Sequence, residues 1–453
     1  MSRDAAGNAG VGQRVGLWLG PAAFAFMLLL PGPGDLSAAG WRTAAVAAWM
    51  AIWWVTEAVP IPATALLPLV LLPLAGIADM AASARSYANE LVFLQMGGFM
   101  LAAAMERWGL HKRIALSVVS LVGTGPRRLV LGFMVASAFV SMWISNTATT
   151  AMMLPIALAV GRLFRPLDSS GPYELGICLL LGIAYASTMG GVATLIGTPP
   201  NVVLAAQASK LLGVEIGFVD WMLVGVPMTV LLVPAGWLLL VRLFPPEAVR
   251  ADASQLLAEQ RRGLGPLSRG ELSVAVVFVC TALAWVVREP KAFGSLTVPG
   301  IGSLAPAVKD STIAMVAAVV LFALPVDRRR GVFVLDWNTA REIPWGVLVL
   351  FGGGLSLAEA MRTSGLAAWI GATVAGLHAL PAWLVVLTVA ALFVFLTEVT
   401  SNLATATMAM PVMAGAASGL GVDPLVLMSA AALSASMAFM LPVATPPNAI
   451  VFG

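Results

Sequence analysis

Long apolar runs, interrupted by short polar stretches, are the dominant pattern along this chain of 453 residues. Many of them reach about 18 residues, the length at which a helix crosses the apolar core of a bilayer. The alternating pattern of outer-membrane barrel strands is not seen. The sequence therefore predicts an all-α polytopic membrane protein. The predicted apolar segments are residues 16–30, 41–58, 61–74, 91–105, 129–159, 175–197, 221–244, 272–287, 312–325, 344–361, 383–413 and 425–443.

Two of these runs contain polar clusters that resemble each other. Residues 140–155 read V-S-M-W-I-S-N-T-A-T-T-A-M-M-L-P, and residues 396–411 read L-T-E-V-T-S-N-L-A-T-A-T-M-A-M-P. One constant shift along the chain aligns Asn146 with Asn402 and Pro155 with Pro411. The same shift aligns the glycine pairs at 97–98 and 353–354. Internal repetition of this kind is typical of secondary transporters.

A second duplicated motif, T-P-P-N, occurs at 198–201 and at 445–448. Two consecutive prolines remove two backbone N–H donors, so a helix cannot continue through them. Each copy therefore predicts a discontinuous helix whose free carbonyls are available to a cation. Gly197 and Ala444 precede the two copies and allow the backbone to approach closely. An ordinary loop at a helix end is the alternative, and the duplication argues against it.

The repeat suggests four segments. These are an N-terminal segment with the first helix at 1–40, a first repeat at 41–244 with a hairpin near 120–155, a linker loop at 245–271, and a second repeat at 272–453 with a hairpin near 383–413. A full apolar helix follows the first T-P-P-N copy, whereas few residues follow the second. Symmetry therefore predicts that the second repeat lacks its last helix, either by truncation or naturally.

Composition and loop charge indicate the setting. Hydrophobic residues make up 60% of the chain and charged residues only 10%, too apolar for a soluble domain. Most of the 25 lysines and arginines lie in loops that we place inside, together with the N-terminus. We expect a bacterial-type inner or plasma membrane, a cytoplasmic N-terminus and two inverted halves. The net charge of +3 reflects these loops and does not indicate nucleic-acid binding.

The polar clusters suggest a chemistry. Unpaired polar groups in lipid are costly, so each cluster is expected to form a re-entrant hairpin that turns at Ser-Asn-Thr. Helix N-termini then direct free N–H groups toward an anion, and Ser145, Asn146 and Thr147 donate to its oxygens. Carbonyl and amide oxygens can hold Na⁺. Helix–helix hydrogen bonding is the alternative function of such clusters.

Charged residues are scarce in the apolar segments. Glu57 and Glu398 are the main ones, and neither polar cluster contains lysine or arginine. A carboxylate at depth is a functional candidate by default. Glu398 would repel a dianion in contact with it, so a structural or cation-attracting role is favoured, and Glu57 is interpreted as an interfacial or scaffold residue. Neutralisation of an anion by helix dipoles, amides and co-bound cations predicts cation-coupled binding.

These motifs resemble the divalent anion/sodium symporter (DASS) family of di- and tricarboxylate and sulfate transporters. The resemblance extends over essentially the whole chain and includes W-W-V-T-E-A-V-P-I-P-A-T-A-L-L-P at 53–68, S-N-T at 145–147, G-T-P-P-N at 197–201, T-S-N at 400–402 and A-T-P-P-N at 444–448. It implies inverted repeats with two re-entrant hairpins, a scaffold domain that forms a homodimer, and a transport domain that moves as an elevator.

The resemblance also implies binding residues. One Na⁺ site would involve Ser141, Ser145, Asn146 and Gly197, and the other Thr397, Thr400, Asn402 and Ala444. The substrate would meet Ser145, Asn146, Thr147, Thr198, Ser401, Asn402, Thr445 and Pro446. Leu403 departs from the family pattern, because a strict second S-N-T would place threonine there. One hydroxyl donor is lost, which favours asymmetric recognition.

The predicted function is secondary active transport, driven by Na⁺, of a C4-type dicarboxylate such as succinate, malate or fumarate, or of the related 2-oxoglutarate. Sodium-independent dicarboxylate exchange, or transport of sulfate or another dianion, is the alternative within the class. A passive anion channel is an alternative from another class. An enzyme is not expected, because the two histidines and two cysteines fit no base or nucleophile constellation, and no organic cofactor is implied.

Overall fold

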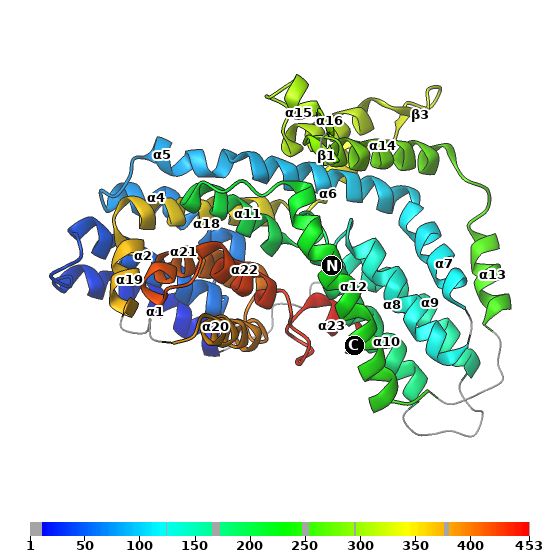
Figure 1. The fold of residues 1–453 in the computed structure, drawn as a ribbon, viewed down its shortest axis with the longest axis horizontal. Helices are drawn as coiled ribbons and strands as arrows, with labels where there is room; N and C mark the ends of the chain where they lie inside the picture. The colour runs from blue at the N-terminus through cyan, green and yellow to red at the C-terminus, as the bar shows by residue number, and fades with distance from the viewer. Residues whose placement is uncertain are drawn as a thin grey trace. The chain divides into compact units, whose positions relative to one another are not determined.

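The computed structural model describes residues 11–123, 125–164, 173–246, 253–293, 296–375 and 380–452. These residues are almost entirely helical, with two short antiparallel strand pairs, and Figure 1 shows the elements in chain order from blue to red. The predicted all-α architecture is confirmed. Residues 1–10 of the predicted N-terminal segment and 247–252 of the predicted linker lie outside the described part.

Six helices within the described ranges are long and apolar enough to cross a membrane. They are Met80–Trp108, Asn146–Phe164, Glu174–Gly191, Phe218–Leu243, Arg269–Val286 and Asn402–Leu420. The first two predicted runs also form helices, α1 (Val11–Leu29) and α2 (Ala38–Thr56), of 19 residues each. They are long enough to cross a membrane but not apolar enough to belong to this group of six.

The chain divides into two compact units built from segments that are distant in sequence. The first unit comprises residues 1–92, 203–215 and 344–438, and the second comprises 93–202, 216–343 and 439–453. The first unit contains α1, α2, α3 (Ile61–Thr64), α4 (Leu67–Leu74), α5 (Met80–Arg85), η1 (Ser86–Ala88), most of α11 (Pro199–Leu212), α18 (Trp345–Thr363), α19 (Leu366–Val374), α20 (Ala382–Thr397), α21 (Asn402–Leu420) and α22 (Pro424–Ala435).

The second unit is the larger of the two in number of elements. It contains most of α6 (Glu90–Trp108), α7 (Leu110–Val122), α8 (Pro126–Ser141), α9 (Asn146–Phe164), α10 (Glu174–Gly191), α12 (Phe218–Leu243), α13 (Ser254–Gly263), α14 (Arg269–Val286), β1 (Lys291–Phe293), β2 (Leu296–Val298), α15 (Ile301–Leu304), α16 (Asp310–Ala323), β3 (Pro325–Asp327), β4 (Val332–Phe333), α17 (Trp337–Ala340) and α23 (Pro446–Phe452). Strand β1 pairs with β2, and β3 with β4.

The core of the second unit lies between α8, α9, α10 and α12, which run side by side in Figure 1. Phe133 of α8, Met153 of α9 and Ile183 of α10 are fully buried there. Close approach of α10 to α8 depends on Gly190, since a Cβ at this position would lie 2.2 Å from the Ala138 carbonyl oxygen. Small residues at helix contacts are typical of membrane proteins.

In the first unit, α19 packs on α21, and α21 packs on α22. The contact between α19 and α21 again uses small residues. A Cβ on Gly415 would lie 2.4 Å from the Ala367 carbonyl oxygen, and one on Gly419 would lie 2.0 Å from that of Gly371. Backbones therefore touch at positions four residues apart on both helices, which is the small-xxx-small pattern of helix association in lipid.

Two glycines at equivalent positions of the sequence repeat have the same backbone conformation. Gly109 separates α6 from α7, and Gly365 separates α18 from α19. Both have left-handed backbone conformations, with φ of 74° and 82°. Glycine adopts this conformation at little steric cost, so both positions can turn the chain sharply between two helices.

A set of polar contacts within the second unit anchors α7 to the beginning of α14. Both ends of the Arg113 guanidinium bind Glu271, with Nε 2.9 Å from Oε1 and Nη2 3.2 Å from Oε2. Glu271 also accepts from the backbone N–H of Ser268, whose hydroxyl accepts from the Glu271 N–H in return, which is a capping box. Trp108 donates to the Val334 carbonyl at 2.7 Å. Trp108 and Arg113 therefore anchor this part of the chain to the rest of the second unit.

Candidate functional site

The first polar cluster forms the tip of a helical hairpin in the second unit. Helix α8 ends at Ser141, residues 142–145 make the turn, and α9 begins at Asn146. The turn thus precedes the expected Ser-Asn-Thr position, and Asn146 already belongs to the helix. The Ser145 hydroxyl accepts from the Ala148 N–H at 3.2 Å and caps α9. The exposed Ser145 and Thr147 flank the first free N–H groups of this helix.

A hydroxyl–amide contact fixes the orientation of Asn146. The buried Ser141 hydroxyl donates to Asn146 Oδ1 at 2.6 Å. The amide also lies against the end of α10, because a Cβ added to Gly191 would be 2.5 Å from Asn146 Oδ1 and 3.0 Å from its Nδ2. We refer to this pairing of a hydroxyl with an asparagine five residues later as the hydroxyl–amide clamp. It leaves the Nδ2 group of Asn146 as a donor.

The first T-P-P-N copy interrupts a helix, as predicted. Helix α10 ends at Gly191 and α11 begins at Pro199, a position where proline is favoured because it needs no N–H partner. Between them, the Thr194 hydroxyl donates to the Met142 carbonyl at 2.5 Å and accepts from the Gly197 N–H at 3.1 Å. The break is therefore bound directly to the tip of the hairpin.

Oxygen atoms gather around this break. Asn201 donates its amide to the carbonyls of Thr194, at 2.7 Å, and Gly191, at 3.0 Å. Its Oδ1 atom has no hydrogen-bond partner in the described part of the chain, and neither do the hydroxyls of Thr149 and Thr150, which are fully buried on α9. Carbonyl, amide and hydroxyl oxygens are the ligands that hard monovalent and divalent cations take. This region can hold a cation such as Na⁺.

Helix α12 supports the same break from the other side. Trp221 donates its indole N–H to the Val192 carbonyl at 2.8 Å, and Thr229 donates to the Met189 carbonyl at 2.9 Å. Gly225 permits this approach, since a Cβ there would lie 2.5 Å from the Val192 oxygen. The last carbonyls of α10 are therefore satisfied within the protein, as burial in an apolar surrounding requires.

The second T-P-P-N copy belongs to the second unit as well. Helix α22 ends at Ala435, and α23 begins at Pro446 and packs against α9 and α10. Asn448 donates its amide to the Leu441 carbonyl at 3.0 Å, as Asn201 does to Thr194, seven residues earlier in each case. Thr445 and Asn448 are buried. The structure thus brings the second T-P-P-N segment to the helix that carries the first S-N-T.

The second polar cluster forms a matching hairpin tip in the first unit. Helix α20 ends at Thr397, the turn covers 398–401, and α21 begins at Asn402. Thr397 donates to Asn402 Oδ1 at 2.7 Å, which repeats the hydroxyl–amide clamp, and also lies 2.7 Å from the Ala435 carbonyl. The hydroxyls of Thr400 and Thr405 are 2.6 Å apart. Glu398 is buried in this turn.

The predicted site residues fall into two groups. The second unit holds Ser141, Ser145, Asn146, Thr147, Gly197, Thr198, Ala444, Thr445 and Pro446, and the first unit holds Thr397, Thr400, Ser401 and Asn402. That the two tips meet in one site stays a prediction. Sequence reasoning did not identify Thr194, Gly191 or Thr405. Thr194 lies three residues before the G-T-P-P-N motif, and this closeness to the motif is the sequence signal that could have identified it.

Carboxylates and imidazoles do not contribute a metal centre in the described residues, since no group of three or more histidine, cysteine, aspartate or glutamate side chains converges there. Ligands for a cation would therefore come from neutral oxygens. Such sites suit a weakly held monovalent ion that must be released, rather than a resident transition metal.

Comparison with known proteins agrees with the class that this arrangement indicates, a membrane transporter with broken helices and paired hairpins. A model of the family described as "Sodium:sulfate symporter transmembrane region" matches residues 13–453, and the chain belongs to this family. It is 42% identical over 450 residues to the "Sodium-dependent dicarboxylate transporter SdcS" of Staphylococcus aureus strain USA300, covering 98% of this chain and 85% of the relative. The same protein from strain NCTC 8325 gives the same values.

The fold also resembles a solved structure. The YdaH transporter of Alcanivorax borkumensis, whose crystal structure "reveals an unusual topology", matches with a TM-score of 0.51 and 18% sequence identity. The match covers 80% of this chain and 76% of that chain. At this identity the likeness concerns the fold alone.

Proposed function

We propose that this protein is a secondary active transporter that moves a C4-type dicarboxylate across the membrane together with Na⁺. The observation that carries the proposal is the duplicated hydroxyl–amide clamp, Ser141 with Asn146 and Thr397 with Asn402. Each clamp sits where a helix begins, and the related proteins from Staphylococcus aureus are named sodium-dependent dicarboxylate transporters.

The clamps suggest how an anion is held without a cationic side chain. Each clamp fixes an asparagine with its Nδ2 group free to donate to a carboxylate oxygen. The free N–H groups at the starts of α9 and α21 add donors and a positive helix end. We assign the substrate to Ser145, Asn146, Thr147, Thr198, Ser401, Asn402, Thr445 and Pro446.

Sodium ions provide the remaining positive charge. We assign one Na⁺ to oxygens of Ser141, Ser145, Asn146 and Gly197, and the other to Thr397, Thr400, Asn402 and Ala444. The oxygen-rich break at residues 192–198 supports the first assignment. A bound cation next to each asparagine offsets the charge of the dianion, which accounts for coupling: the anion binds well only when Na⁺ is present.

Three wider features belong to the same proposal. The two tips meet at one site near the middle of the bilayer, a transport domain carrying them moves as an elevator, and two copies of the chain form a homodimer through a scaffold domain. The N-terminus lies in the cytoplasm of a bacterial-type cell. The inverted repeats and the distribution of basic loops support this arrangement.

Uptake of labelled succinate into proteoliposomes tests the function. We expect saturable uptake that requires an inward Na⁺ gradient and needs no substrate inside. Uptake that needs internal dicarboxylate and ignores Na⁺ would show exchange instead, and uptake without saturation would show a channel. Competition by an excess of unlabelled sulfate measures whether a tetrahedral dianion shares the site.

A further inference from the structure

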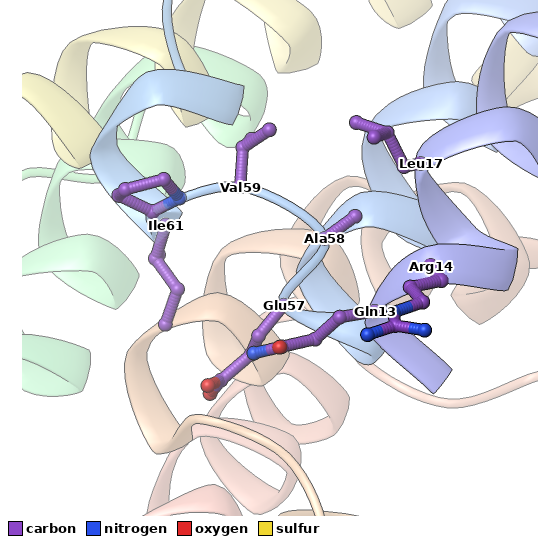
Figure 2. A pocket seen from close by; sticks show the side chains of 8 residues that line it. Gln13, Arg14, Leu17, Glu57, Ala58, Val59 and Ile61 are labelled. Carbon is purple, nitrogen blue, oxygen red and sulfur yellow. The ribbon is translucent and has the colours of Figure 1, made fainter. Parts of the chain in front are cut away.

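A cavity in the first unit lies outside the hairpins and the T-P-P-N segments. It has a volume of about 360 Å³ and is formed where the start of α1 faces the corner after α2 (Figure 2). Gln13, Arg14 and Leu17 line it from α1, and Glu57 and Ile61 line it from the corner. This volume is at the lower end of the range of small-molecule sites.

The cavity carries one charge of each sign. Arg14 and Glu57 both line it, and within the described residues neither side chain has a hydrogen-bond or ion-pair partner. Figure 2 shows the Glu57 carboxylate on one side and the Arg14 guanidinium on another, as separate groups. Two opposite charges that share a cavity without pairing leave room for a ligand that carries both charges itself.

The backbone holds Glu57 in an unusual conformation. Its φ of 47° and ψ of 39° are left-handed, and it is the only non-glycine residue with positive φ among the described residues. Its N–H closes α2 by donating to the Trp53 carbonyl. Glycine would make this corner at lower steric cost, so the acidic side chain is kept at the expense of strain. Strain of this kind is found where a side chain has a binding role.

The surroundings of the cavity indicate which ligand can reach it. Val11, Trp18 and Leu29 along α1 are 80%, 77% and 84% exposed, so one face of this helix is apolar and open. In a membrane protein such a face contacts lipid, and tryptophan is enriched where the acyl region meets the headgroups. The cavity adjoins this face at the polar end of α1.

We propose that the cavity binds the headgroup of a phospholipid that carries a primary amine. The phosphate faces the Arg14 guanidinium, and the ammonium group donates to the Glu57 carboxylate. An anionic headgroup without an amine would leave Glu57 unpaired beside a phosphate. A quaternary amine would keep the charge but could not donate hydrogen bonds.

Native mass spectrometry of the full chain in detergent tests the proposal with three lipids that have identical dioleoyl chains. We expect phosphatidylethanolamine to bind about tenfold more tightly than phosphatidylglycerol, the difference that one charge-assisted hydrogen bond makes, with phosphatidylcholine in between. Soluble glycerophosphoethanolamine should compete, which shows that the headgroup is recognised. Equal binding of all three lipids would refute the proposal.

Variants separate the two charges. Glu57→Gln and Glu57→Gly should both bring phosphatidylethanolamine and phosphatidylglycerol to equal affinity, and Glu57→Gly should fold at least as well because it relieves the strained corner. Arg14→Ala should weaken both lipids alike. Glu259→Gln and Arg261→Ala on the exposed α13 are matched controls that should change nothing. A preference for phosphatidylethanolamine that survives both changes at Glu57 contradicts the assignment.

Discussion

Both hairpin tips contain the hydroxyl–amide clamp, but different contacts support the clamp in each tip. Both have a hydroxyl that donates to the amide oxygen of an asparagine at the start of the next helix. The first tip is fixed from outside, by Thr194 of the broken helix. The second tip is fixed by its own hydroxyls, through Thr400 and Thr405, and by the end of α22. The clamp is therefore repeated in both tips, whereas the contacts that support it are not repeated.

This difference changes which groups remain available to a ligand. Thr149 is the repeat equivalent of Thr405, but the position equivalent to Thr400 is Ile144. The Thr149 hydroxyl is consequently buried without a partner among the described residues, whereas that of Thr405 is paired. Unpaired buried hydroxyls are costly, so a ligand is the natural partner for Thr149. At this repeat position the first tip therefore has a buried hydroxyl that is free to bind a ligand, whereas the second tip has a hydroxyl that is already paired.

The largest effect is expected from removing either asparagine. Asn146→Ala and Asn402→Ala should each lower succinate uptake by about two orders of magnitude, because each deletes a donor to a charged carboxylate. Proteoliposome uptake at equal protein content measures this. Asn338→Ala on α17 is the matched control and should leave uptake unchanged. Transport at the wild-type rate by either site variant would mean that the two tips do not share a substrate.

Removing the external support of the first tip should have the next largest effect. Thr194→Val deletes the bond to the Met142 carbonyl and removes the acceptor of the Gly197 N–H, which loosens a proposed Na⁺ ligand, so the Na⁺ concentration for half-maximal uptake should rise about tenfold. Thr388→Val, which removes a hydroxyl bonded only within α20, should leave the Na⁺ dependence as it is. A Thr194→Val protein with normal Na⁺ dependence would show that the break is held by other contacts.

The two equivalent threonines should give opposite results. Thr405→Val removes a buried hydrogen bond and should destabilise the protein by about 1 kcal/mol. Thr149→Val should not destabilise it, since the hydroxyl is unpaired, but should weaken Na⁺ binding. Thermal unfolding with and without Na⁺ measures both. If the two variants lose the same stability in the absence of Na⁺, the contrast between the tips is wrong.

The smallest effect is expected at Leu403, the repeat equivalent of Thr147. Leu403→Thr restores the missing hydroxyl and should change the preference among succinate, malate, fumarate and sulfate by a few-fold, within the energy of one neutral hydrogen bond. The Na⁺ dependence should change less. Thr147→Leu is the reciprocal variant. Identical selectivity across these anions would argue against a role for this position in recognition.

The sequence predicted those parts of the fold and site that depend on local pattern. The lengths of the apolar runs predicted the helices, and the double prolines predicted the interruptions between α10 and α11 and before α23. The turn lies slightly earlier in the chain than the sequence predicts, because Asn146 is the first residue of α9. Thr194 could not be assigned a role, since its partner Met142 is 52 residues away and depends on how closely α10 approaches the tip.

The same limit applies to Thr149 and Thr405. Both occupy equivalent positions of the sequence repeat, and only the three-dimensional neighbours reveal that one is paired and the other is not. Sequence repetition therefore identifies corresponding positions but does not show that they have corresponding partners. The meeting of the two tips, the dimer and the elevator movement remain predictions for the same reason, because they concern contacts between distant segments.

The anchor between Arg113 and Glu271 bears on how the chain is made. During synthesis the guanidinium on α7 is made long before the carboxylate that opens α14, so the later half arrives at a partner already in place. A later half produced on its own would carry the buried Glu271 carboxylate, and the N–H of Ser268 would be its remaining hydrogen-bond donor. We expect it to insert less efficiently than the same segment behind α7, which an in vitro translation assay with microsomes or inverted vesicles would measure.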